Sequence, residues 1–301
     1  MKTIVTIPPY ATFIDEVVAH SSVEGLRLNV VMPIKQDETI EDVLKRLYDK
    51  ANGKDLWIDL KGRQLRVENF GVPPFTEIRI SHNIKVDTPV EAYFNDGKES
   101  ATILEVCGNQ IIMQEGPKRV VGPGESINIP SSSLTIEGFL TDTDKRYIEA
   151  AKNIGLNKFM LSYVEGNQDI VDFRNFVGCD VDLAAKIESS KGLDYVQNNY
   201  NNDVRLMTAR GDLFVEVNKP HEIIKATYDI IKADKNAIVA SRIFPSLAYN
   251  LEPECSEIND VDNLMRMGYR TFMLGDDVCQ QRNSLISALN LFKAMTENYK
   301  L

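Results

Sequence analysis

The sequence has little of what disulfides, zinc clusters and membranes require. Four cysteines occur among 301 residues, and they are widely spaced with no CxxC pair: Cys107, Cys179, Cys255 and Cys279. This spacing excludes a zinc site built on paired cysteines and is typical of reduced thiols in the cytoplasm. No apolar run approaches the roughly 20 residues that cross a bilayer, and no export signal precedes the first strand pattern. We therefore expect a cytoplasmic protein without a membrane partner.

Basic clusters and nucleophile motifs are also missing. The net charge is −10, and basic residues are interspersed with acidic ones, so the chain lacks the electrostatic footprint of a nucleic-acid-binding protein. His20, His82 and His221 are scattered, neighbour no nucleophile motif and are expected at surface or capping positions. No GxGxxG or Walker motif follows a predicted strand. With 43% hydrophobic residues, the chain is expected to bury a large core and to act on a small molecule.

The hydrophobic pattern alternates between the strand and the helix period along most of the chain. Strands are predicted at residues 3–7, 26–31, 56–60, 158–162, 181–187, 204–208, 237–241 and 271–274. Helices are predicted at residues 14–20, 40–51, 144–154, 169–176, 194–198, 222–233, 258–267 and 284–297. Eight βα units favour a closed (β/α)8 TIM barrel of the α/β class over an open doubly wound sheet, which usually needs fewer units.

One segment interrupts this alternation. After the third strand, short alternating runs are separated by turn sequences at residues 73–74, 95–97 and 122–124. We predict a small all-β domain at residues 67–140, inserted after the third barrel strand. Residues 1–66 and 141–301 would then form the barrel.

Polar residues collect at the predicted carboxyl ends of the barrel strands, where active sites of such barrels are built. They are Arg27 and Asn29, Asp59 and Lys61, Ser162, Lys186 and Glu188, Arg210 and Asp212, and Ser241 and Arg242. Lys186 and Glu188 are two residues apart on one strand, so their side chains point to the same side. Asp212 would lie beside Glu188, and two carboxylates suit Mg²⁺ or Mn²⁺. A plain salt-bridge network at the rim is the alternative that spacing leaves open.

Several of these segments resemble the pyruvate kinase family. Residues 185–188 read AKIE, like its SKIE strand, and residues 207–217 read MTARGDLFVEV, like its longer and more specific MVARGDLGVEI signature. Residues 26–29 (LRLN) and 58–66 (IDLKGRQLR) correspond to ARLN and LDLKGPEIR, and residues 95–114 correspond to the core of the family's inserted domain. The resemblance covers essentially the whole chain. The regulatory domain that usually follows the barrel is expected to be absent, because Leu301 follows the eighth helix.

The resemblance implies a set of roles. Glu188 and Asp212 would bind Mg²⁺, and Lys186 would stabilise the transferring phosphoryl group and the enolate. The amides of Gly211 and Asp212 would hold the substrate carboxylate, and Arg27 would contact phosphate. Lys186 is expected to cost the metal-free protein stability, since burial disfavours its charge.

Further roles come with departures from the family. Ser241 stands where a threonine normally helps to deliver a proton to the enolate carbon. Asn29 and Asp59 would be the remainder of a monovalent-cation site; Val31 supplies no oxygen and Leu60 replaces a hydroxyl, so potassium should stimulate weakly or not at all. Residues 30–33 (VVMP) replace Phe-Ser-His-Gly, and residues 275–278 (GDDV) replace Ser-Gly-Glu-Thr.

Three functions are compatible with these residues. The first is the family's phosphotransfer, which converts phosphoenolpyruvate and ADP to pyruvate and ATP with Mg²⁺. The second is a Mg²⁺-dependent lyase or decarboxylase that acts on a pyruvoyl substrate such as oxaloacetate. The third is a non-catalytic relative that binds a small carboxylate. A homo-oligomer is compatible with all three.

Overall fold

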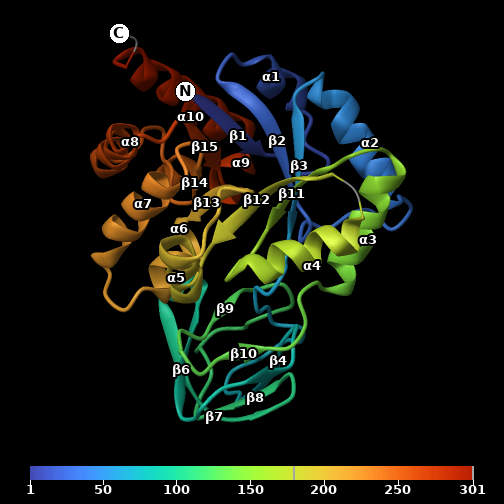
Figure 1. The fold of residues 1–301 in the computed structure, drawn as a ribbon, viewed down its shortest axis with the longest axis vertical. Coiled ribbons are helices and arrows are strands. Elements are labelled where there is room, and N and C mark those ends of the chain that lie inside the picture. The colour runs from blue at the N-terminus through green and yellow to red at the C-terminus, as the bar shows by residue number, and fades with distance from the viewer. Residues whose placement is uncertain (179, 300–301) are drawn as a thin grey trace.

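Eight parallel strands close into a barrel in the order β1-β15-β14-β13-β12-β11-β3-β2. We obtained this fold as a computed structural model that describes residues 1–178 and 180–299. The strands are β1 (Lys2–Thr6), β2 (Val23–Asn29), β3 (Asp55–Leu60), β11 (Lys158–Leu161), β12 (Asp182–Ile187), β13 (Arg205–Ala209), β14 (Ile238–Ala240) and β15 (Thr271–Leu274). All eight predicted barrel strands are present, which confirms the (β/α)8 fold (Figure 1).

The eight predicted helices are present as well. They are α1 (Ile14–Ala19), α2 (Ile40–Ala51), α3 (Asp142–Asn153), α4 (Asn167–Val177), α5 (Ser190–Asn198), α7 (Glu222–Ala233), α8 (Cys255–Met267) and α10 (Arg282–Glu297). The prediction missed two short helices, α6 (Arg210–Glu216) and α9 (Asp276–Cys279). Each begins soon after a barrel strand, and each is too short to show a helical period. No helix in the described ranges is both long and apolar enough to cross a membrane.

The predicted β-rich segment folds into seven strands between β3 and β11. These are β4 (Glu77–Arg79), β5 (Ile84–Lys85), β6 (Val90–Phe94), β7 (Glu99–Cys107), β8 (Gln110–Met113), β9 (Ile127–Asn128) and β10 (Thr135–Ile136). Five of them form an antiparallel sheet in the order β4-β8-β7-β6-β9, which we call the inserted sheet, and β5 pairs with β10. The inserted strands lie together below the barrel in Figure 1. They pack around their own apolar core, which includes Ile78, Phe94 and Ile103.

One buried carboxylate ties the barrel to the insertion. Asp144 forms a capping box with Thr141 at the start of α3, where the chain re-enters the barrel. The same carboxylate accepts hydrogen bonds from the backbone amides of Lys61 and Gly62, at 2.7 and 3.1 Å, where the chain leaves β3. Gly62 has φ +51, and a side-chain carbon there would lie 2.6 Å from the carbonyl oxygen of Ser162. Only glycine fits this turn. The hydrogen bonds to Asp144 hold the segment that leaves β3 beside the segment that re-enters the barrel at α3.

The barrel interior is filled with apolar side chains below the rim. Trp57 packs there with Ile4, Met160 and Met207, so Trp57 is a packing residue. Cys107, Cys255 and Cys279 are free thiols, whereas Cys179 lies outside the described residues.

The expectation for the histidines is wrong at one position. His82 is buried in the insertion, where its Nδ1 atom lies 2.9 Å from the hydroxyl oxygen of Ser81. His20 caps the carboxyl end of α1 and His221 precedes α7. None of the three lines the cavity described below.

Candidate active site

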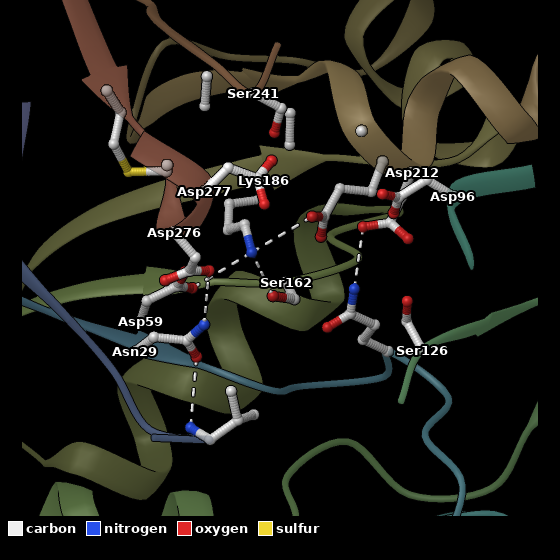
Figure 2. A pocket seen from close by; sticks show the side chains of 18 of the residues that line it. Asn29, Asp59, Asp96, Ser126, Ser162, Lys186, Asp212, Ser241, Asp276 and Asp277 are labelled. Atoms are coloured by element: carbon white, nitrogen blue, oxygen red, sulfur yellow. Dashed lines mark hydrogen bonds and ion pairs between the residues drawn. The ribbon is translucent and has the colours of Figure 1, made fainter. Parts of the chain in front are cut away.

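A cavity of about 500 Å³ opens at the carboxyl ends of the barrel strands, and we call it the rim cavity. The predicted site residues that line it are Arg27, Asn29, Asp59, Lys186, Glu188, Gly211, Asp212 and Ser241, together with Lys61, Ser162 and Arg242. The insertion contributes Asp96, Lys98 and Ser126 to the lining. Asp96 and Ser126 lie on the side of the cavity away from Asp59 and Asn29 in Figure 2. Parallel strands therefore bring together the residues that the sequence predicted, and the insertion covers them. Arg210 is the exception, since it is buried against Asp260 and does not line the cavity.

Lys186 stands at the centre of a buried ionic network. Its Nζ atom lies 3.2 Å from Asp59 Oδ1, 3.2 Å from Glu188 Oε1 and 2.7 Å from Ser162 Oγ. Burial lowers the pKa of Lys186, but the charges of Asp59 and Glu188 outweigh burial and raise it above its usual value. Lys186 is therefore an ammonium that its neighbours stabilise. The expectation that Lys186 costs the metal-free protein stability did not include these two carboxylates, which offset the cost of burying its charge, and it stays a prediction that the Lys186→Met variant tests.

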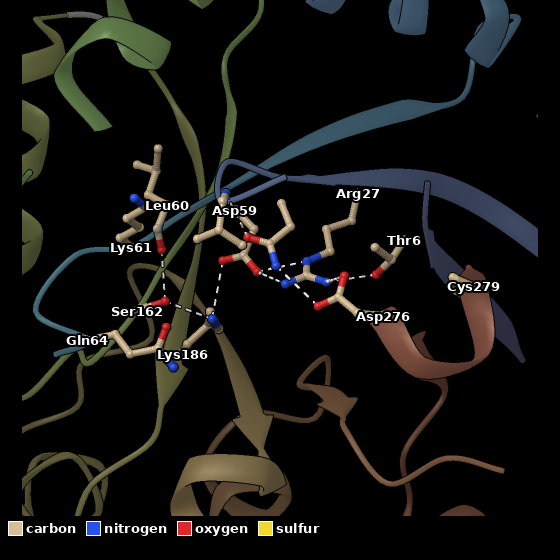
Figure 3. A network of polar contacts seen from close by, with 12 residues as sticks. Thr6, Arg27, Asp59, Leu60, Lys61, Gln64, Ser162, Lys186, Asp276 and Cys279 are labelled. Atoms are coloured by element: carbon tan, nitrogen blue, oxygen red, sulfur yellow. Dashed lines mark hydrogen bonds and ion pairs between the residues drawn. The ribbon is translucent and has the colours of Figure 1, made fainter. Parts of the chain in front are cut away.

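Arg27 extends this network across the rim (Figure 3). Its Nε and Nη2 atoms donate to Asp59 Oδ2 at 2.8 and 2.5 Å, and its Nη1 atom donates to Thr6 at 2.8 Å and to Asp276 Oδ1 at 3.1 Å. Burial raises the pKa of Asp59, but the charges of Lys186 and Arg27 bring it below its usual value. The salt-bridge network, which the spacing of the residues left open as an alternative, is thus present. It is built from the proposed catalytic residues themselves.

Glu188 and Asp212 form a pair of carboxylates on the other side of Lys186. Glu188 follows β12 and accepts a hydrogen bond of 2.9 Å from the backbone amide of Tyr163. Burial raises the pKa of Glu188, Lys186 lowers it, and the negative charge of Asp212 adds to the rise. Asp212 lies in the first turn of α6, where Gln64 and Asn128 donate to its two oxygens at 2.9 and 3.1 Å.

These oxygens fit a divalent cation of the magnesium type. Mg²⁺ binds one or two protein carboxylates and completes its shell with water and substrate oxygens. A cation here would offset the burial of Glu188 and its repulsion from Asp212, the two causes that raise the pKa of Glu188. Among residues 1–178 and 180–299, no three acidic, histidine or cysteine side chains are grouped to hold a metal by themselves. Solvent and substrate would thus supply the remaining ligands.

Ser241 lies next to Gly211 in the lining of the cavity. A side-chain carbon on Gly211 would lie 3.4 Å from Ser241 Oγ, so the hydroxyl is next to the start of α6. Ser241, Arg242 and Phe244 all have positive φ angles, of 67°, 58° and 52°, and such left-handed conformations cost free energy that surrounding contacts must offset. Arg210 supplies one such contact by donating to the carbonyl oxygen of Ser241 at 2.9 Å.

The predicted monovalent-cation residues are already paired within the protein. Asp59 accepts from both Arg27 and Lys186. The side-chain oxygen of Asn29 accepts from the Val31 amide at 3.3 Å, and its amide nitrogen donates to Asp276 Oδ2 at 3.1 Å.

Sequence reasoning missed several residues that hold the site together. Gln64 and Asn128 fix Asp212, Tyr163 contacts Glu188, and Asp276 contacts Arg27 and Asn29. Gln64 does carry a signal in the sequence, since it lies within residues 58–66, which resemble a family motif. Asn128 carries no such signal, because it lies 84 residues from Asp212 in a two-residue strand.

Comparison with known proteins agrees with the motifs. The family model described as "Pyruvate kinase, barrel domain" matches residues 76–282. The chain belongs to the pyruvate kinase family. It is 27% identical to a pyruvate kinase of Thermoplasma acidophilum, with 92% of this chain and 54% of that protein covered. It is 24% identical to one of Borreliella burgdorferi, with 85% and 59% covered. The chain thus spans about half the length of the curated pyruvate kinases that it matches.

A solved structure supports the same fold. A pyruvate kinase from Cryptosporidium parvum superposes with a TM-score of 0.79 at 18% identity, and the match covers 99% of this chain and 69% of that one. At this sequence identity, the match supports the barrel fold with its insertion but not the chemistry of the site, which depends on the residues of the rim cavity.

Proposed function

We propose that this protein is a pyruvate-kinase-like phosphotransferase that converts phosphoenolpyruvate and ADP to pyruvate and ATP. The observation that carries the proposal is the position of Lys186: a buried ammonium, paired with Asp59 and Glu188, that lines the same cavity as Asp212 and Ser241. A preorganised positive charge in a dry site stabilises negative charge that develops during reaction. Phosphoryl transfer and enolate formation both develop such charge.

The substrate would lie between the two sides of the cavity. The first turn of α6 contains Gly211 and Asp212, whose backbone N–H groups have no acceptor within the helix and suit a carboxylate. Arg27 would contact the phosphoryl group, and Lys186 would stabilise the enolate oxygen. Ser241 would relay a proton to the enolate carbon; the position of its hydroxyl beside Gly211 supports this role. Residues 67–140 would act as a domain that limits access of water.

Glu188 and Asp212 would bind Mg²⁺ or Mn²⁺. The cation would supply positive charge that polarises substrate oxygens. Asn29 and Asp59 would give at most a weak monovalent-cation site, since their oxygens already accept hydrogen bonds within the protein.

A second candidate is a Mg²⁺-dependent lyase that acts on a pyruvoyl substrate such as oxaloacetate. It uses the same enolate chemistry at Lys186 but needs no nucleotide. The specific observation in its favour is that Arg27, the proposed phosphate contact, already has a carboxylate partner in Asp276. A non-catalytic carboxylate-binding role is less favoured, because binding a carboxylate does not by itself need the buried negative charges of Glu188 and Asp59 beside Lys186.

One assay separates the candidates. Purified protein is incubated with Mg²⁺ and either phosphoenolpyruvate or oxaloacetate, with and without ADP, and pyruvate is followed. ADP-dependent pyruvate release from phosphoenolpyruvate supports the phosphotransferase. ADP-independent release from oxaloacetate, above the rate of Mg²⁺ alone, supports the lyase. Release of no pyruvate from either substrate would leave the binding role.

A further inference from the structure

Arg27 has three partners, and one of them differs from the other two. Asp59 and Thr6 are buried, with 2% and 0% of their surface exposed, and belong to the barrel wall. The Asp276 side chain is 42% exposed and reaches Arg27 from the mouth of the rim cavity. A ligand that enters the cavity can therefore replace Asp276 but not Asp59 or Thr6.

Asp276 binds its two partners as a bound anion would. One carboxylate oxygen accepts from Arg27 Nη1 at 3.1 Å, and the other accepts from Asn29 Nδ2 at 3.1 Å. The two donors come from β2 and the carboxylate comes from the start of α9, which is 249 residues away from Arg27 in the sequence. Figure 3 shows Asp276 facing Arg27 from the opposite side to Asp59. The carboxylate thus occupies the open side of the guanidinium.

We infer that Asp276 is a specificity-determining residue, because its carboxylate holds the anion position at Arg27 and Asn29 that a substrate phosphate would take. This inference rests on the proposed contact between Arg27 and phosphate. A phosphate group that binds there must displace Asp276 and then remain near its negative charge. Small carboxylates that use only Gly211, Asp212 and Lys186 avoid this cost. The carboxylate of Asp276 therefore lowers the affinity of the site for a phosphate group at Arg27, compared with a neutral side chain in its place.

Two further aspartates surround the same mouth. Asp277 follows Asp276 on α9, and Asp96 comes from the insertion; both line the cavity and are exposed. Asp277 has no hydrogen bond to Arg27 or Asn29 in the described chain. It therefore adds negative charge near the anion position without occupying that position. This difference makes Asp277 a matched control for Asp276.

The test compares phosphate binding by Asp276→Asn, Asp277→Asn and the parent protein in Mg²⁺ buffer, by calorimetry with inorganic phosphate. Asparagine keeps the shape and removes the charge. Asp276→Asn should bind phosphate about tenfold more tightly than the parent, since a hydrogen bond to a charged group is worth that factor or more. Asp277→Asn should gain much less. Phosphate should also raise the thermal midpoint of Asp276→Asn more than that of the parent.

A double variant locates the bound phosphate. Adding Arg27→Lys to Asp276→Asn keeps a cation beside Asp59 but removes the planar fork that binds phosphate with two donors, so the gain should disappear. Equal phosphate affinity of Asp276→Asn and the parent would overturn the inference, as would an equal gain in Asp277→Asn or a gain that survives in the double variant. Asp276→Ser serves as a second variant if the asparagine variant does not fold. Because phosphate binding is measured without turnover, a gain would stand even if the parent makes no pyruvate from phosphoenolpyruvate.

Discussion

Asn128, on β9 of the inserted sheet, donates a hydrogen bond of 3.1 Å to Asp212 in the first turn of α6 on the barrel. Gln64, in the segment that leaves β3 for the insertion, donates to the other oxygen of Asp212 at 2.9 Å. Both oxygens of a proposed metal ligand are thus oriented by amides on the insertion side. The position of the insertion and the orientation of this carboxylate are coupled.

Removing the Asn128 amide should weaken metal binding. Residues that orient a metal ligand typically contribute about 10- to 100-fold to metal affinity, so Asn128→Ala should lower Mn²⁺ affinity by about tenfold in a calorimetric titration. Asn83→Ala is the control, since this exposed asparagine contacts Glu137 elsewhere on the insertion. Equal Mn²⁺ affinity in the two variants would show that the insertion does not orient Asp212.

The metal assignment itself is tested at the two carboxylates. Glu188→Gln and Asp212→Asn should each abolish or strongly weaken Mg²⁺ and Mn²⁺ binding, because each removes one charged oxygen ligand and half of the negative charge. Glu165→Gln is a matched control, since this carboxylate accepts from Ser189 and does not line the rim cavity. The assignment is wrong if calorimetry finds parent-like affinity in both of the first two variants.

Lys186→Met should reduce turnover of the active substrate by roughly 10² to 10³, because a preorganised charge is lost. The metal-free variant should also be less stable by about 3–5 kcal/mol, the usual cost of removing one partner of a buried ion pair, because Glu188 loses the ammonium beside it whereas Asp59 keeps Arg27. Lys158→Met is the control: Lys158 is also paired with two aspartates, but at the opposite end of the barrel strands. Turnover and thermal midpoint are measured for both variants. Unimpaired turnover of a folded Lys186→Met protein would remove Lys186 from the mechanism.

Potassium should stimulate the activity weakly or not at all. Asp59 already accepts from Arg27 and Lys186, Val31 offers only its backbone, and Leu60 has no side-chain oxygen. KCl and NaCl of equal ionic strength screen exposed charges alike, so the rates in the two salts should agree within about twofold. A strong activation by KCl that NaCl does not reproduce would contradict this prediction.

Glu216 should make stability depend on pH. Burial, with the charges of Asp212 and Glu165, raises the pKa of Glu216 from 4.5 to about 8, although a hydrogen bond from Asn128 opposes the rise. The folded protein therefore holds a proton that the unfolded chain releases, so this contribution is complete below pH 4.5 and is lost as the pH rises through about 8.

Glu216→Gln cannot ionise and avoids this loss. Its free energy of unfolding, measured in urea with EDTA, should increase relative to that of the parent between pH 5.5 and pH 8.5, which brackets most of the stated window. Glu222→Gln, on the first turn of α7, is the control and should show no such trend. A difference between Glu216→Gln and the parent that stays constant with pH would show that Glu216 ionises normally in the folded protein.

The sequence by itself determined the barrel and the set of residues on its rim. The strand and helix periods are local signals, and the carboxyl ends of parallel strands must meet at one edge. Lys186, Glu188, Asp59 and Arg27 were therefore predicted to lie together without knowledge of any distance. The same logic fails for α6 and α9, which are too short to carry a period.

Only the tertiary structure decided how those rim charges are paired. Asp276 reaches Arg27 across 249 residues, and Asn128 reaches Asp212 across 84 residues and from a separate sheet. A hydrogen bond between polar side chains depends on atomic distance and direction, and it leaves no repeating pattern in the chain. For the same reason the sequence suggested that Lys186 destabilises the protein, whereas the folded rim surrounds its ammonium with the carboxylates of Asp59 and Glu188, which stabilise it.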